Sequence, residues 1–295
     1  MTESALLPYL PPWDWQQFHS HFALRLLPGV EALDDDRYSR SVRLRDSCGW
    51  FSVRPIADHP ALELTFGDSL RPYGQQLLSR VRTMFDLDAD PHTIVRNFAA
   101  DPLLGPLVAA NPGLRLPTAF DPFEQAVRAI VGQQVTVKAA VTITRRLVER
   151  LGEPLPNAPA PLALLFPAAQ RIAEDSLPNI GMPGRRVEAL RRFAGAVAEG
   201  ALQLHAEDGA DALVRRLCAL PGIGPWTAEY IALRGFGEAD AFPAADLGLL
   251  KAPVWGAAGV SAKALGARAQ AWRPWRAYAT IHLWHDYSTG PTDRS

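Results

Sequence analysis

The chain has 295 residues, which is long enough to form more than one hydrophobic core. Hydrophobic residues make up 48% of it, yet no unbroken apolar stretch approaches the roughly 18–20 residues of a membrane-spanning helix, so the sequence excludes a protein built on such helices. The net charge of −1 at pH 7 excludes the strong basic surplus of many nucleic-acid-binding proteins, and such binding would have to use local clusters of arginine.

Two cysteines, Cys48 and Cys218, are too few for a disulfide framework or a four-cysteine iron–sulfur cluster. The sequence also begins without the basic-then-apolar order of a signal peptide. We therefore expect reduced thiols and a cytoplasmic location.

Residues 1–88 are predicted to form a separate domain of mixed helices and antiparallel strands. Apolar residues within Trp15–Leu27 and Gln75–Leu87 recur with the spacing of amphipathic helices. Strand patterns occur between them at residues 42–45, 50–53 and 62–66. This part of the chain has no cluster of chemically reactive side chains, which indicates a supporting role.

Residues 89–295 are predicted to be helical throughout, because the strand patterns end there. The expected helices lie at residues 93–100, 102–110, 121–131, 137–151, 168–176, 185–198, 211–220, 261–270 and 275–285. Gly152–Pro167 carries five prolines and is expected to be a surface connection.

The helix after residue 121 has a strong start signal. Asp121 is a suitable N-cap, Pro122 suits the first helical position, and Glu124 completes a capping-box pattern. The apolar pattern then breaks at Gly132–Thr136 before the next helix begins. A polar break between two apolar helices is a candidate for contact with a partner outside the core.

Leu220–Lys251 is the stretch around which the chain is organised. A helix is expected to end at Leu220, the run Pro221-Gly222-Ile223-Gly224 forms a hairpin, and Pro225 opens a second helix. The glycines allow positive φ and let backbone N–H groups approach a phosphate. Asp246 follows in an otherwise small and apolar segment. On these residues alone, the hairpin could be an ordinary helix corner and Asp246 an N-cap.

Several motifs together resemble the 3-methyladenine DNA glycosylase II (AlkA) family of the helix–hairpin–helix DNA glycosylase superfamily. They are Asp121–Thr136, Gly181–Leu190, the hairpin with Asp246, and Trp272–Tyr278, and the resemblance covers almost the whole chain. It implies an α+β fold, in which the amino-terminal domain precedes two packed helical subdomains with the active cleft between them.

The resemblance also implies the site. Asp246 would be the catalytic carboxylate, and Trp226, Tyr230 and Trp284 would line the base pocket, although these rings are also suited to core packing. Gln134 would be the residue inserted into DNA, where the family pattern has an apolar wedge; a solvent-facing loop residue is the alternative. The DNA-binding residues would be Gln134, Pro221, Gly222, Ile223, Gly224 and Thr227. The backbone carbonyls of Cys218, Leu220 and Ile223 would hold a monovalent cation, Na⁺ or K⁺.

The implied activity is hydrolysis of the N-glycosidic bond of alkylated bases, of the 3-methyladenine and 7-methylguanine type, in duplex DNA. The base is flipped into the pocket, and an abasic site remains. Lyase-competent relatives carry a lysine where this chain has Trp226, so a monofunctional enzyme without a required cofactor is expected. We also expect a monomer in the bacterial nucleoid. Two alternatives stay open: a glycosylase for deaminated or oxidised bases, and a non-catalytic protein that only grips DNA.

Overall fold

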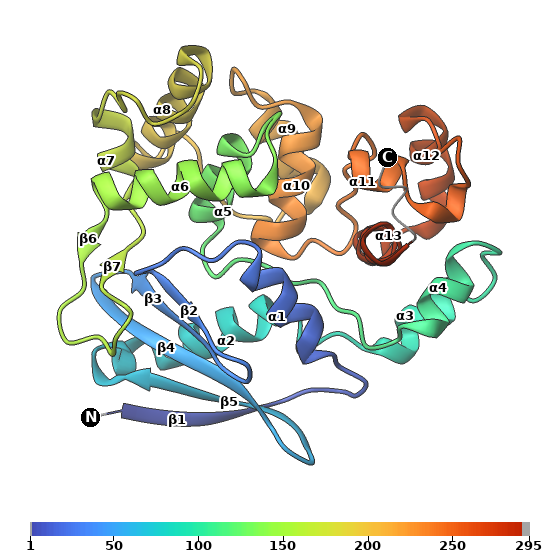
Figure 1. Cartoon of the computed structure of the whole chain (residues 1–295), viewed down its shortest axis with the longest axis horizontal. Helices are drawn as coiled ribbons and strands as arrows, with labels where there is room; N and C mark the ends of the chain where they lie inside the picture. The colour runs from blue at the N-terminus through green and yellow to red at the C-terminus, as the bar shows by residue number, and fades with distance from the viewer. Residues whose placement is uncertain (1, 291–295) are drawn as a thin grey trace.

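The computed structural model describes residues 2–290, and its amino-terminal part is built on a five-stranded antiparallel sheet (Figure 1). The strand order is β1-β5-β4-β3-β2. The strands are β1 (Thr2–Pro8), β2 (Glu31–Leu33), β3 (Tyr38–Leu44), β4 (Ser47–Ile56) and β5 (His59–Gly67). The three predicted strands correspond to β3, β4 and β5. The two edge strands were not predicted, because β2 is very short and β1 has a mostly exposed side-chain pattern.

Helices pack against this sheet and complete its core. They are α1 (Trp15–Ala23), the 3₁₀ helix η1 (Asp68–Tyr73) and α2 (Gly74–Met84). Helix α1 ends before the predicted Leu27, whose buried backbone N–H instead donates to the Glu31 side chain at 3.0 Å. Figure 1 shows α1 between the sheet and the helical region. The predicted boundary at residue 88 falls in the segment that joins α2 to the next helix.

The rest of the described chain is mainly helical, and most of its buried apolar side chains form one hydrophobic cluster. The helices are α3 (Pro91–Phe98), α4 (Leu104–Ala110), α5 (Pro122–Val131), α6 (Val137–Leu151), α7 (Ala169–Glu174), α8 (Gly184–Ala198), α9 (Ala210–Cys218), α10 (Pro225–Phe236), α11 (Leu247–Leu250), η2 (Pro253–Trp255), α12 (Ala262–Arg268), η3 (Ala269–Trp272) and α13 (Arg276–Thr289). Figure 1 shows α5 and α10 at the centre, with α6, α7 and α8 on one side and α11, α12 and α13 on the other. This arrangement confirms the predicted α+β fold class.

Helix α5 begins as predicted, but the expected capping box is wrong. The Asp121 side chain accepts the Phe123 N–H at 2.8 Å, and Pro122 occupies the first turn. Glu124 instead turns inward, where its carboxylate accepts from Arg40 on β3 and from Arg128 on α5, both at 2.6 Å. Arg128 also contacts Glu31 of β2 at 2.9 Å. Glu124 is therefore part of a buried ion-pair network that joins the sheet to the helical region.

The proline-rich connection is more structured than predicted. It contains two short antiparallel strands, β6 (Glu153–Pro154) and β7 (Leu164–Leu165). The Leu164 N–H donates to the Gly29 carbonyl at 2.9 Å, and Ser41 Oγ donates to the Leu164 carbonyl at 2.6 Å. The segment is thus a second tie between the two parts of the chain. Over residues 2–290, no helix is long and apolar enough to cross a membrane.

Candidate active site

The predicted hairpin connects α9 to α10. Gly222 has a φ of +89°, and a Cβ atom there would lie 2.6 Å from the Cβ of Ala189 on α8, so glycine is needed for both conformation and space. Ile223 is buried and anchors the turn, whereas Pro221, Gly222 and Gly224 are exposed. The exposed face of the hairpin therefore consists of backbone and small residues, next to the amino terminus of α10.

Asp246 lies at the start of the short helix α11 and receives four hydrogen bonds. Its Oδ1 accepts the N–H groups of Gly248 at 3.0 Å and Leu249 at 3.3 Å, which is an N-cap arrangement. Trp284 Nε1 of α13 donates to the same oxygen at 2.8 Å. Trp226 Nε1 of α10 donates to Oδ2 at 3.0 Å. The capping role and the aromatic contacts therefore coexist, and Oδ2 keeps the greater free acceptor capacity.

The three aromatic residues predicted to line a pocket lie together around this carboxylate. Trp226 and Tyr230 stack, with their ring centroids 5.4 Å apart and an angle of 17° between the planes. Tyr230 meets Trp284 edge to face at 6.0 Å. All three side chains are half-buried. Gly248 allows this close packing, because a Cβ there would lie 3.1 Å from Trp284 Cδ1 and 3.2 Å from Asp246 Oδ1.

Arg234, which was not predicted as a site residue, lies behind the aromatic cluster. It follows Trp226 and Tyr230 at four-residue spacing on α10, and its guanidinium carbon lies 4.7 Å from the Trp284 ring centroid. Its side chain donates to the Pro117 carbonyl at 2.8 Å. Burial lowers the pKa of Arg234 to about 10, against the opposing effect of Tyr230, so the group is still charged at pH 7. Its spacing was the signal that could have revealed it.

The charge of Arg234 also affects His21 of α1, in the amino-terminal domain. Burial lowers the pKa of His21 well below its usual value, and the charges of Arg25, Arg234 and Arg128 add to the effect. The imidazole is therefore neutral at pH 7. No sequence pattern had indicated this influence of α10 on α1, which lies more than two hundred residues earlier in the chain.

Two family models match this chain. Residues 4–121 match the AlkA N-terminal domain model, and residues 127–274 match the HhH-GPD superfamily of base excision DNA repair proteins. The chain is 34% identical to DNA-3-methyladenine glycosylase 2 of Escherichia coli K12 over 290 residues, covering 97% of this chain and 99% of the relative. This chain belongs to the AlkA family of helix–hairpin–helix DNA glycosylases.

Other AlkA-type proteins are also similar. A probable bifunctional transcriptional activator/DNA repair enzyme AlkA of Mycobacterium tuberculosis is 39% identical over 283 residues, and the match covers 96% of this chain but 57% of that protein. The chain therefore spans little more than half the length of that relative. The solved 3-methyladenine DNA glycosylase of Archaeoglobus fulgidus has the same fold, with a TM-score of 0.82, 19% identity, and coverage of 98% of this chain and 99% of that one.

Nearby acids in this AlkA-family chain are engaged elsewhere. Glu229 accepts the Phe242 N–H at 2.9 Å, and Asp240 pairs with Arg273 at 2.6 Å and with Arg276 at 2.8 Å. Among the described residues, no group of three or more His, Cys, Asp or Glu side chains is placed to hold a metal ion. Among the acids of the described residues near the site, Asp246 is the one that accepts hydrogen bonds from the indole N–H groups of Trp226 and Trp284.

The loop between α5 and α6 carries Gln133 and Gln134. Gln134 is exposed and has a φ of +56°, which is unusual for a residue other than glycine. Gln133 is half-buried, and its side chain reaches the hairpin. The predicted inserted residue therefore projects from a loop that is bonded to the predicted DNA-gripping element.

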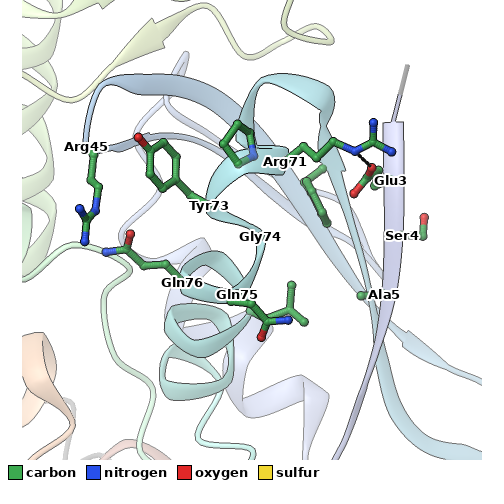
Figure 2. A pocket seen from close by; sticks show the side chains of 12 residues that line it. Glu3, Ser4, Ala5, Arg45, Arg71, Tyr73, Gly74, Gln75 and Gln76 are labelled. Carbon is green, nitrogen blue, oxygen red and sulfur yellow. Dashed lines mark ion pairs between the residues drawn. The ribbon is translucent and has the colours of Figure 1, made fainter.

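A hollow of about 630 Å³ in the AlkA-type amino-terminal domain lies apart from these residues (Figure 2). It is bounded by β1, η1 and α2, and Figure 2 shows Arg71 paired with Glu3 on one wall. The Arg45 guanidinium lies 5.9 Å from the Tyr73 ring centroid on another. None of the residues assigned above to the candidate site lines this hollow.

Proposed function

We propose that this chain is a monofunctional DNA glycosylase that hydrolyses the N-glycosidic bond of alkylated bases in duplex DNA. It would act as a monomer in the bacterial nucleoid, flip the damaged base out of the helix, and leave an abasic site. The observation that carries the proposal is the carboxylate of Asp246. Two indole N–H groups and two backbone N–H groups hold it beside stacked aromatic rings.

The proposed chemistry uses Asp246 as a fixed negative charge. Breaking the C1′–N bond develops positive charge on the sugar, and a preorganised carboxylate stabilises that charge without having to reorient. Because Oδ1 already accepts three hydrogen bonds and Oδ2 accepts one, Oδ2 is the oxygen assigned to the sugar and the attacking water. The leaving base takes the electron pair of the broken bond.

Base selection is assigned to the aromatic residues. A cationic base such as 3-methyladenine is attracted to an aromatic face by about 0.5–2 kcal/mol. Arg234 occupies one face of Trp284 and adds a positive charge close to it, which opposes that attraction. The rings of Trp226 and Tyr230 are therefore the better partners for a cationic base. Most of the discrimination would come from the greater leaving ability of the damaged base.

DNA binding is assigned to the hairpin and to the neighbouring loop. The backbone N–H groups of Gly222 and Gly224 would contact a phosphate, whereas the Ile223 N–H is used within the turn by the Leu220 carbonyl. Thr227 would support the turn. Gln134 would fill the gap left by the flipped nucleotide. Arg185, Arg186, Arg192 and Glu188 line a hollow next to the hairpin, and Glu188 pairs with Arg192 at 2.7 Å. Arg185 and Arg186 therefore supply local positive charge in a chain whose net charge is −1.

The test is to incubate the chain with methylated duplex DNA and to identify the released bases. Release of 3-methyladenine and 7-methylguanine, with abasic sites that stay uncleaved until alkali is added, is the expected result. Parallel duplexes with hypoxanthine, uracil or 8-oxoguanine separate the alternative glycosylase activities. Binding without release of any base would identify a non-catalytic protein and contradict the proposal.

We also propose that the hairpin holds Na⁺ or K⁺ through the carbonyls of Cys218, Leu220 and Ile223. The Leu220 carbonyl accepts the Ile223 N–H at 3.2 Å, which fixes the turn and leaves a second lone pair on that oxygen. Replacing both cations with N-methylglucamine at constant ionic strength is expected to weaken binding to an abasic duplex. An unchanged affinity would contradict the cation site without bearing on the glycosylase activity.

A further inference from the structure

Gln133 joins the loop of Gln134 to the hairpin. Its side-chain nitrogen Nε2 donates to the Gly222 carbonyl at 3.0 Å and to Thr227 Oγ1, also at 3.0 Å. Both N–H bonds of the amide are used, and Thr227 is almost completely buried. The amide orientation is therefore fixed, because a rotated amide would place its oxygen against the Gly222 carbonyl.

Helix α8 closes the connection on its other side. Arg186 Nη1 donates to the backbone carbonyl of Gln133. Three residues further along α8, Ala189 packs against Gly222 with no room for a side chain between them. The loop, the hairpin and α8 thus each contact the other two. They surround a hollow of about 410 Å³, which is lined in part by Gln133, Gln134 and Gly222. The three segments are thus joined to one another by direct contacts.

The conformation of Gln134 explains why such an assembly is needed. A left-handed backbone costs a residue with a side chain about 1–2 kcal/mol, and it persists only where the surroundings determine it. Gln133 is fixed on one side. On the other, Thr136 caps α6 by accepting the Ala139 N–H at 3.2 Å. Gln134 is held between these two points and projects into solvent.

We propose that Gln133 is a positioning residue that locks the inserting side chain of Gln134 to the phosphate-gripping hairpin. The inference rests on the proposed function. When the hairpin seats on the DNA backbone, the Gln133 bonds fix where Gln134 enters the duplex, so that gripping and gap-filling occur as one event. The task of Gln133 is confined to the opening of the base pair, because its bonds reach the Gly222 carbonyl of the hairpin and the Thr227 hydroxyl in the first turn of α10, and neither reaches the Asp246 carboxylate or an indole group.

The test compares Gln133→Met with wild type on two duplexes that each contain one 7-methylguanine. In one duplex the lesion is paired with cytosine, and in the other it faces an abasic-site analogue, which removes the pairing that must be broken. Single-turnover base release from the paired duplex is expected to fall about tenfold, the effect of losing two hydrogen bonds. Release from the unpaired duplex should change less than about twofold, since little energy is needed to flip that base.

Three further variants sharpen the result. Gln170→Met, on the exposed surface of α7, is the matched control and should behave as wild type. Thr227→Val removes one of the two acceptors of the Gln133 amide, so it should slow release from the paired duplex more than from the unpaired one, by a smaller factor than Gln133→Met. If Gln133→Met does not fold, Thr227→Val tests the proposal in its place. The double variant Gln133→Met/Gln134→Ala should be no slower than Gln134→Ala alone, because both changes disable the same step.

Equal slowing of both duplexes, or slowing of neither, would overturn the positioning role, as would full additivity in the double variant. Failure of the proposed function looks different: wild-type protein would then release no 7-methylguanine from either duplex. Melting temperatures measured on all variants exclude a loss of folded protein as the source of the difference.

Discussion

Asp246→Asn is expected to abolish base release while leaving the binding of damaged DNA intact. Removing one preorganised electrostatic partner of a transition state slows an enzyme by about 10²–10³-fold, and here a full charge opposite the sugar is lost. We therefore expect a fall of at least about 10³-fold in the single-turnover rate on 7-methylguanine duplexes. The affinity for DNA should not decrease, because the removed charge repels phosphates.

The hydrogen bonds of Asp246 allow asparagine to replace it with little change in local structure. Asparagine is as good an N-cap as aspartate, so its oxygen can keep the bonds from Gly248, Leu249 and Trp284. Its amino group would face Trp226 Nε1, which is also a donor, and that bond is lost. The start of α11 should thus survive while the carboxylate charge disappears.

Glu238→Gln is the matched control, since it is the same change of acid to amide a few residues beyond α10. Its rate should equal that of wild type. If Asp246→Asn releases bases at the normal rate, or if both variants are equally slow, the role assigned to Asp246 is wrong. Binding should be measured on a duplex that contains an abasic analogue, which reports the grip on DNA independently of catalysis.

Glu124→Ala is expected to have the largest effect on stability. Removing one partner from a buried ion pair costs about 3–5 kcal/mol, because the remaining charges stay buried without compensation. Glu124 faces both Arg40 and Arg128, and all three side chains are largely buried. The loss should appear as a lower midpoint of urea unfolding. It should also appear as separate calorimetric transitions, since the network joins the sheet to the helical region.

The control for this prediction is Glu149→Ala on α6. Glu149 pairs with Arg145 at 2.9 Å, but both side chains are more than half exposed, and such pairs contribute about 0–1 kcal/mol. Equal destabilisation by the two variants would show that the buried network has no special importance for stability.

The same network predicts how stability changes with pH. Burial alone would raise the pKa of Glu124, but Arg40 and then Arg128 outweigh it and hold the pKa below its usual value. A carboxyl with a depressed pKa stabilises the folded state above its unfolded pKa, and this contribution is lost as the pH falls through the folded value. In Glu124→Ala this acid-induced loss should be smaller than in wild type.

Local signals predicted much of the fold. The N-cap and proline at residues 121–122 mark the start of α5, and alternation of apolar residues marks the central strands, because such patterns depend on neighbouring residues alone. The hairpin glycines and Asp246 were also recognisable, since spaced motifs carried them. Glu124 shows the limit: its spacing indicated a cap, but a buried arginine eighty-four residues away determines its position.

The parts of the site that were missed depend on distant contacts. Arg234 acquires its surroundings only when α10 and α13 are brought together, and Gln133 only when its loop meets the hairpin and α10. Nothing near Gln133 in the sequence indicates that its amide bonds with Gly222 and Thr227, more than eighty residues later. The resemblance to a known family therefore suggested the groups proposed for the chemistry, whereas the groups that hold them became visible only in three dimensions.

The ties between the sheet and the helices restrict how a protein of this kind can be shortened or recombined. Glu124 of α5 forms an ion pair with Arg40 of the sheet, and Arg128 of α5 forms one with Glu31. Leu164 of β7 is hydrogen-bonded to Gly29 and Ser41. A helical region expressed without the sheet would expose charged side chains that have lost their ion-pair partners, and backbone groups that have lost their hydrogen bonds. The interface with the amino-terminal domain is thus part of what stabilises the helical region. A hybrid enzyme therefore has to retain both parts of the chain or have the interface between them redesigned.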